Sequence, residues 1–262
     1  MTMGSSDGLL EIAGKRFSSR LLIGTGSYAS FAEMQACHRA SGAEIATVAV
    51  GRHDLSQGPG DSVLKHIDRS RITLLPNTAG AYTAAEAVRL ARLSREALGT
   101  EWVKLEVLGN PTTLWPDVAE TLAACRTLVR EGFIVLPYTT DDLVVAKRLE
   151  DEGAAAVMPL GSMIGSGLGV LNPVTLSLII QAARVPVIVD AGVGQASDAA
   201  LAMELGADGV LLNSAVALCQ DPVSMAQAMG LAVRAGRLSF LSGRIAKKTY
   251  ATPSSPGAGL QG

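Results

Sequence analysis

Short apolar runs alternate with amphipathic segments along most of this chain. The apolar runs are rich in Val, Ile and Leu and last only a few residues, which is typical of strands buried on both faces of a parallel sheet. The segments between them carry helix start and stop signals, of which the capping-box pattern Thr83-Ala-Ala-Glu86 is the clearest. We expect eight strands, at residues 21–24, 44–50, 73–76, 101–109, 133–138, 155–160, 186–190 and 209–212. We expect helices at residues 31–40, 62–68, 83–98, 116–131, 142–150, 173–183 and 196–205, a short one from 213, and a last one at 222–235.

The repeated strand–helix order predicts an α/β fold, a (β/α)8 TIM barrel, because eight such units occupy about this length of chain. A doubly wound open sheet is the alternative, and the number of strands argues against it. Residues 10–17 are expected to form a short N-terminal hairpin that turns at Ala13-Gly14. We therefore expect a flexible N-terminus at residues 1–8, a single barrel domain at 9–250 and a disordered tail at 251–262.

The amino-acid composition excludes several classes of binding partner for this protein. The 262 residues carry a net charge of −2 without a basic patch, so we expect neither nucleic-acid binding nor attachment to an anionic membrane. No apolar run has the length of a membrane span and the N-terminus lacks the apolar region of a signal peptide, so we expect a soluble, cytoplasmic protein. Because Cys37, Cys125 and Cys219 lack metal-ligand spacing, we expect reduced thiols and no metal site.

The expected strand at residues 101–109 carries two charged residues, Lys104 and Glu106, in a segment otherwise suited to burial. Side chains alternate along a strand, so the two lie on one face, about 6.5–7 Å apart. On an exposed antiparallel sheet such a pair would simply face water. In a barrel either face of the strand is enclosed, and a buried ammonium is costly unless it is paired or used in chemistry. Lys104 is therefore a candidate for Schiff-base formation, because burial favours the nucleophilic amine.

Glu106 has two opposite consequences for this chemistry. An ionised neighbour stabilises the ammonium form of Lys104, and the sequence leaves open which effect prevails in the resting protein. A carboxylate is also useful, because imine formation and tautomerisation move protons at several steps. Asp190, at the end of the seventh expected strand, is a second candidate acid or base, and an equal alternative is that it caps the loop that follows.

The loops after the last two strands predict a phosphate site. In a TIM barrel the active site lies at the C-terminal ends of the strands, and the loops after strands seven and eight form a recurrent phosphate cradle. Here these loops are Ala191-Gly192-Val-Gly194 and Asn213-Ser214-Ala215, where glycine and a helix terminus expose backbone N–H groups. The loop Gly165-Ser-Gly-Leu-Gly169 is placed to close over the ligand. We reject a dinucleotide fingerprint there, because no acidic ribose ligand follows at the required distance.

Four motifs together resemble those of bacterial thiazole synthase, an enzyme family of thiamine biosynthesis. They are Trp102-Val-Lys104-Leu-Glu106-Val, Pro159-Leu-Gly-Ser-Met-Ile-Gly165-Ser-Gly-Leu-Gly, Val189-Asp190-Ala-Gly-Val-Gly and Leu212-Asn213-Ser-Ala. The likeness extends from about Leu10 to Tyr250. The family most often has threonine where Ser214 stands, which keeps the hydroxyl, and proline where Met163 stands, which changes the stiffness of the loop.

The resemblance implies that Lys104 forms an imine with 1-deoxy-D-xylulose 5-phosphate and that Glu106 and Asp190 act as catalytic acid/base residues. The substrate-binding positions that it implies are Gly165, Ala191, Gly192, Asn213 and Ser214. It further implies sulfur transfer from the thiocarboxylate of a small ubiquitin-like sulfur carrier protein, and ring completion by dehydroglycine (iminoacetate). No cofactor is implied, and a homo-oligomer, often a tetramer, is expected.

Two other functions stay open at the level of the sequence. A Schiff-base aldolase acting on a sugar phosphate would share the lysine and the phosphate cradle, but it would cleave a carbon–carbon bond. In a non-catalytic phosphometabolite-binding barrel, Lys104 and Glu106 would form only a buried ion pair. Such a barrel would bind ligand without a borohydride-trappable adduct.

Overall fold

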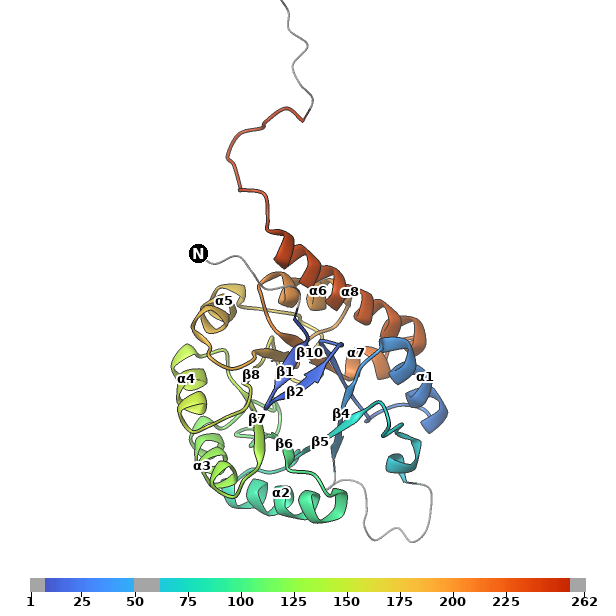
Figure 1. The fold of residues 1–262 in the computed structure, drawn as a ribbon, viewed down its shortest axis with the longest axis vertical. Helices are drawn as coiled ribbons and strands as arrows, with labels where there is room; N and C mark the ends of the chain where they lie inside the picture. Colours follow the sequence, from blue (N-terminus) through green and yellow to red (C-terminus); the bar gives the residue numbers. More distant parts are fainter. Residues whose placement is uncertain (1–7, 50–61, 255–262) are drawn as a thin grey trace, which may run out of the picture.

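The computed structural model describes residues 8–49 and 62–254 of the chain. Most of the expected N-terminal segment 1–8 and of the expected tail 251–262 therefore lies outside the described residues. Eight parallel strands form the centre of the described part (Figure 1). They are β3 (Leu21–Gly24), β4 (Ile45–Ala49), β5 (Thr73–Asn77), β6 (Trp102–Leu105), β7 (Ile134–Thr139), β8 (Met158–Pro159), β9 (Ile188–Asp190) and β10 (Gly209–Leu212).

These strands close into a barrel. Their hydrogen-bonded order is β8-β7-β6-β5-β4-β3-β10-β9. The two ends of this order meet through parallel bridges between Val157 and Val187 and between Leu160 and Asp190. The expectation of a (β/α)8 barrel is therefore confirmed, and the open-sheet alternative is wrong.

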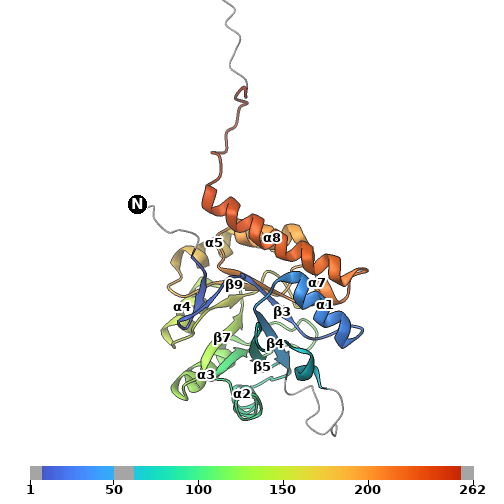
Figure 2. The same ribbon diagram turned by 45° about the vertical axis from the view of Figure 1, so that its right-hand side comes forward.

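Helices follow the strands along the chain and surround the barrel (Figures 1 and 2). They are α1 (Phe31–Ser41), the 3-10 helix η1 (Val63–His66), α2 (Ala84–Leu98), α3 (Val118–Arg130), α4 (Leu143–Asp151), α5 (Pro173–Ala182), α6 (Ala196–Glu204), α7 (Ser214–Ala217) and α8 (Pro222–Ser242). As the capping-box pattern predicts, the Thr83 hydroxyl accepts the N–H of Glu86, at 3.2 Å. In α3 the expected start at Pro116 is two residues early, because the Asp117 carboxylate accepts the N–H of Glu120 and forms the N-cap.

The N-terminal hairpin closes one end of the barrel (Figure 1). Its strands are β1 (Leu10–Ile12) and β2 (Lys15–Phe17), and both turn residues have positive φ, as expected for Ala13-Gly14. The Phe17 ring packs edge-on against Trp102 at a centroid distance of 6.0 Å. The hairpin joins the apolar cluster inside the barrel, which contains Leu10, Ile12, Phe17, Leu22, Ile45, Leu75, Trp102, Leu136, Ala156, Met158, Ile188 and Leu211. One end of the barrel is thus a packed core, and only the other end is free to hold a ligand.

Strand β6 has the alternation that the sequence predicts. Trp102 belongs to the interior cluster, whereas Val103 and Leu105 pack in the larger cluster beneath the helices. Lys104 therefore points into the barrel. This placement removes the solvent-facing interpretation of the Lys104–Glu106 pair.

Two helices differ from their expected lengths for identifiable reasons. The helix expected at residues 62–68 is only the 3-10 turn η1, because the chain becomes extended at Ile67, which is buried in the core. Helix α8 continues to Ser242, seven residues past its expected end at Ala235. Gly236 directly follows that expected end, and a Cβ built there would lie 2.5 Å from the Ala200 carbonyl oxygen, so this glycine permits close packing of α8 on α6.

Beyond α8, residues 244–254 form neither helix nor strand and are exposed. Within the two described ranges, no helix combines the length and apolar character that a membrane span requires.

Candidate active site

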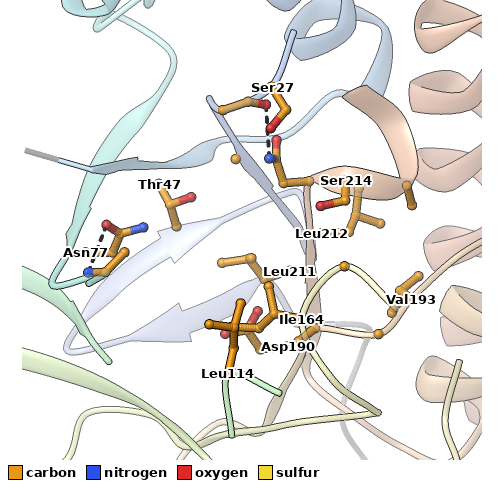
Figure 3. A pocket seen from close by; sticks show the side chains of 18 of the residues that line it. Ser27, Thr47, Asn77, Leu114, Ile164, Asp190, Val193, Leu211, Leu212 and Ser214 are labelled. Carbon is orange, nitrogen blue, oxygen red and sulfur yellow. Dashed lines mark hydrogen bonds between the residues drawn. The ribbon is translucent and has the colours of Figure 1, made fainter. Parts of the chain in front are cut away.

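A pocket of about 670 Å³ opens at the C-terminal ends of the barrel strands (Figure 3). Its lining includes all eight positions that the sequence suggested, namely Lys104, Glu106, Gly165, Asp190, Ala191, Gly192, Asn213 and Ser214. These positions come from four separate regions of the chain, and the barrel topology brings them to one mouth. The volume is typical of a site for a small molecule.

Lys104 forms two ion pairs inside this pocket. Its Nζ lies 2.6 Å from Oδ2 of Asp190 and 3.0 Å from Oε1 of Glu106. All three residues are buried, with 5% or less of their surface exposed. One cation thus faces two carboxylates away from water, where charge interactions are strong and an unpaired charge is costly.

The structure decides whether burial or the neighbouring carboxylates control the protonation state of Lys104. Burial disfavours the ammonium of Lys104, but the neighbouring charges of Asp190 and Glu106 outweigh this effect, so the pKa of Lys104 is raised above its ordinary value. The pKa of Asp190 is also raised, because burial, together with the Glu106 charge, outweighs the attraction of Lys104. The resting cluster therefore holds its proton on Lys104, and Asp190 is the carboxyl group prepared to accept one.

Thr78 fixes the position of Glu106, a role that no pattern in the sequence indicated. Asn77 and Lys104 are the one pair in register between the described residues of β5 and β6. Beyond that point, the Thr78 hydroxyl donates to the Glu106 carbonyl at 2.7 Å and accepts the Glu106 N–H at 2.8 Å. A side chain thus replaces the missing backbone ladder and holds the Glu106 backbone from both sides.

The loops after β8 and β9 pack backbone to backbone beside the ion pairs. The Gly169 N–H donates to the Gly192 carbonyl at 2.8 Å. Gly192 has φ of +78°, and a Cβ there would lie 1.9 Å from Oγ of Ser162. Ala191 also has positive φ, at +68°. Backbone in this strained region is common at ligand sites, and here it turns the chain sharply after Asp190.

The third loop lies after β10, where Asn213 begins the short helix α7. The Asn213 amide donates to the Gly26 carbonyl at 3.0 Å. A Cβ on Gly24 would lie 2.6 Å from the Asn213 side chain, so the end of β3 must be glycine for Asn213 to occupy this place. At the start of α7, the N–H groups of Ser214 and Ala215 have no partner within the helix and are available to an anion.

Part of the pocket wall is apolar and was not anticipated from the sequence. Leu114 and Ile164 line the pocket (Figure 3) and pack with Leu108, Leu160 and Tyr138. Leu114 and Ile164 come from loops without regular structure, where hydrophobic periodicity carries no signal.

Comparison with known protein sequences points to the same family as the sequence motifs. The sequence matches the family model described as "Thiazole biosynthesis protein ThiG" over residues 11–256. It is 59% identical to the thiazole synthase of Geobacter metallireducens, over 98% of this chain and 99% of that protein. It is 60% identical to the thiazole synthase of Solibacter usitatus, over 97% of this chain and 98% of that protein.

Solved structures give the same result for the fold. A chain in the crystal structure of the Amycolatopsis orientalis BexX/CysO complex matches with a TM-score of 0.83 and 33% identity, over 93% of this chain and 100% of that chain. A thiamine phosphate pyrophosphorylase from Pyrococcus furiosus, 13% identical over 82% of this chain and 95% of its own, matches with a TM-score of 0.55, which is a likeness of fold alone. From the family match and the close relatives over nearly its whole length, this chain belongs to the thiazole synthase family of thiamine biosynthesis.

Proposed function

We propose that this enzyme builds the thiazole phosphate moiety of thiamine through an imine between Lys104 and 1-deoxy-D-xylulose 5-phosphate. Dehydroglycine and sulfur from a thiocarboxylated carrier protein supply the rest of the ring. The observation that carries the proposal is the place of Lys104, buried at the base of the pocket between two carboxylates. In that setting the Lys104 amine is the nucleophile, and the two carboxyl groups that accept and donate protons lie within a few ångströms of it.

Imine formation begins with a proton transfer from the Lys104 ammonium to Asp190, 2.6 Å away. Burial raises the pKa of Asp190, which makes this carboxyl group a better proton acceptor than an exposed aspartate. The free amine then attacks the C2 carbonyl carbon of the substrate. One proton of the attacking amine moves to the carbonyl oxygen and Asp190 returns its own proton to the same oxygen, so that water leaves and a protonated C=N bond remains.

Isomerisation then moves the carbonyl from C2 to C3. Asp190 removes the C3 hydrogen as a proton, which gives an enaminol, and returns a proton to C2. Glu106 accepts the proton of the C3 hydroxyl, so that a ketone forms at C3. The sulfur of the thiocarboxylate adds to this ketone, and dehydroglycine closes the ring. Glu106 suits this role because it lies two residues nearer the mouth of the barrel than Lys104.

The phosphate of the substrate binds across the glycine-containing loops after β8 and β9 and the start of α7 after β10. Gly192 and the N-terminus of α7 offer backbone N–H groups, and the Ser214 hydroxyl faces the same pocket. Gly165 has φ of +73° and contributes a surface free of side chain, since a Cβ added there would lie 3.8 Å from Oγ of Ser214.

The sulfur donor is a ubiquitin-like carrier protein whose flexible C-terminus enters the mouth of the barrel. The similar solved structure is of a complex between BexX and CysO, which supports a protein partner for this chain as well. Leu168 and Leu171, in the loop whose Gly165 and Gly167 line the pocket, are 56% and 60% exposed. Exposed apolar side chains at the rim of a site favour contact with a partner surface.

Borohydride trapping tests the proposal. The protein is incubated with 1-deoxy-D-xylulose 5-phosphate, reduced, digested and mapped by mass spectrometry. We expect the label on Lys104 and its loss in Lys104→Arg, which keeps the charge and removes the amine. Lys147→Arg, an exposed lysine on α4, is the matched control and should label normally. Absence of any adduct on Lys104 in the unchanged protein would refute the proposal, and carbon–carbon cleavage would favour an aldolase.

A further inference from the structure

Tyr138 lies beside the ion pairs on the inner face of the barrel. Leu105 of β6 pairs with Pro137 of β7, so the next residues along each chain, Glu106 and Tyr138, are neighbours. The Tyr138 ring centre is 5.7 Å from Nζ of Lys104. Tyr138 itself has no exposed surface.

The Tyr138 hydroxyl is a buried donor that the resting site does not use. It makes no hydrogen bond to any of the described residues. A buried hydroxyl without a partner costs about 1–3 kcal/mol. Burial raises the pKa of Tyr138 well above its ordinary value, and the charges of Asp190 and then Glu106 raise it further, so the group is a neutral phenol that can donate.

The charged groups that face this phenol come from two strands. Lys104 lies on β6, Glu106 directly follows that strand, and Asp190 ends β9, while Leu108 and Leu160 complete its surroundings with apolar side chains. Among these neighbours, Lys104 is the one that donates hydrogen bonds. Asp190 also accepts a backbone hydrogen bond from Ala191, and the Tyr138 hydroxyl is a further donor beside the cluster that the resting site leaves unused.

Imine formation reduces the number of N–H groups that Lys104 can donate to the two carboxylates. The Lys104 ammonium has three N–H groups and serves two carboxylates, whereas a protonated imine nitrogen has a single N–H. One carboxylate therefore loses its donor when the imine forms. Asp190 is the carboxylate whose charge acts most strongly on Tyr138.

We propose that Tyr138 is a positioning residue, whose hydroxyl donates a hydrogen bond to the Asp190 carboxylate once Lys104 has left that carboxylate to form the imine. The inference rests on the proposed function, because it concerns the intermediate of that reaction. The bond holds Asp190 in place and stabilises its ionised form, which is the form that removes the C3 hydrogen. Tyr138 transfers no proton itself.

The test is Tyr138→Phe, measured by exchange of the C3 hydrogen of 1-deoxy-D-xylulose 5-phosphate with deuterium, followed by proton NMR from about pD 5 to 9. A hydrogen bond to a charged group is worth about 1.5–3 kcal/mol, and one pKa unit corresponds to about 1.4 kcal/mol. We therefore expect the acidic limb of the exchange profile to move upward by about one to two units. The sign follows because loss of the donor makes Asp190 harder to ionise.

Two further measurements separate this role from a structural one. Tyr138→Phe should melt at the same temperature as the unchanged protein or higher, since the hydroxyl has no partner in the resting state, and should still be trapped by borohydride at Lys104. Tyr28→Phe is the matched control, because its hydroxyl is also buried and without a partner among the described residues, while the ionisable groups near it are Cys37, Glu33 and Cys219 and not Asp190 or Glu106. Its profile should not move.

An unshifted limb in a folded Tyr138→Phe protein would overturn the inference, as would loss of trapping in that variant. Failure of the unchanged protein to form any adduct on Lys104 would instead refute the proposed function, so the two failures are distinguishable.

Discussion

Replacing Lys104 by methionine should destabilise the protein strongly, and in a way that depends on pH. The substitution leaves Asp190 and Glu106 buried, at 2% and 5% exposure, without the ammonium that lies 2.6 and 3.0 Å from them. Removing one partner of a buried ion pair costs about 3–5 kcal/mol. In a domain of this size 1 kcal/mol corresponds to ~2–4 °C, so we expect a decrease in Tm of roughly 10 °C near pH 8.

The pH dependence of this effect has a definite sign. In Lys104→Met the folded-state pKa of Asp190 rises further above its unfolded value, because burial and the Glu106 charge then act without the opposing attraction of Lys104. The folded state then binds more protons than the unfolded state, so stability falls as pH rises through the folded pKa. The deficit should therefore be small near pH 5 and complete near pH 8. In the unchanged protein the raised pKa of Lys104 and its unfolded value both lie above this window, so Lys104 adds no slope there.

Asp190→Asn is the matched comparison. It leaves one cation and one anion, Lys104 and Glu106, and should cost no more than about 1 kcal/mol at either pH. The assay is thermal and urea denaturation of the three proteins at pH 5 and pH 8. A Lys104→Met protein as stable as the unchanged one at pH 8, or one whose deficit grows toward pH 5, would refute the picture of one cation holding two buried carboxylates.

Two other substitutions test the supports of the site. Thr78→Val removes both hydrogen bonds to the Glu106 backbone. It should lower the free energy of unfolding, measured by urea denaturation, by about 1–3 kcal/mol and should slow borohydride trapping. The control Thr121→Val removes the hydrogen bond from Thr121 to the Asp117 carbonyl, and it should lower stability but leave trapping unchanged. Gly192→Ala would place a Cβ 1.9 Å from Oγ of Ser162 at a φ of +78°, so we expect affinity for 1-deoxy-D-xylulose 5-phosphate to fall more than tenfold by titration calorimetry. Normal affinity in that variant would contradict the close packing of the two loops.

Much of the fold could be predicted from local sequence signals. The capping residue Thr83, the hairpin turn at Ala13-Gly14 and the strand–helix alternation depend on interactions within a few residues, so the sequence shows them directly. The end of the last helix was placed too early. Gly236, just past the expected end, lies inside α8 and permits contact between α8 and α6, a role that only the packed structure shows.

The sequence by itself determined that Lys104 and Glu106 share one face of a strand, because side chains alternate along any strand. Only the tertiary structure decided the state of that lysine. The closed barrel brings Asp190 within 2.6 Å of Lys104, and Thr78 to the Glu106 backbone across 28 residues of sequence. The physical reason is that a pKa depends on burial and on charges a few ångströms away, and those neighbours are set by chain closure, which no local pattern encodes.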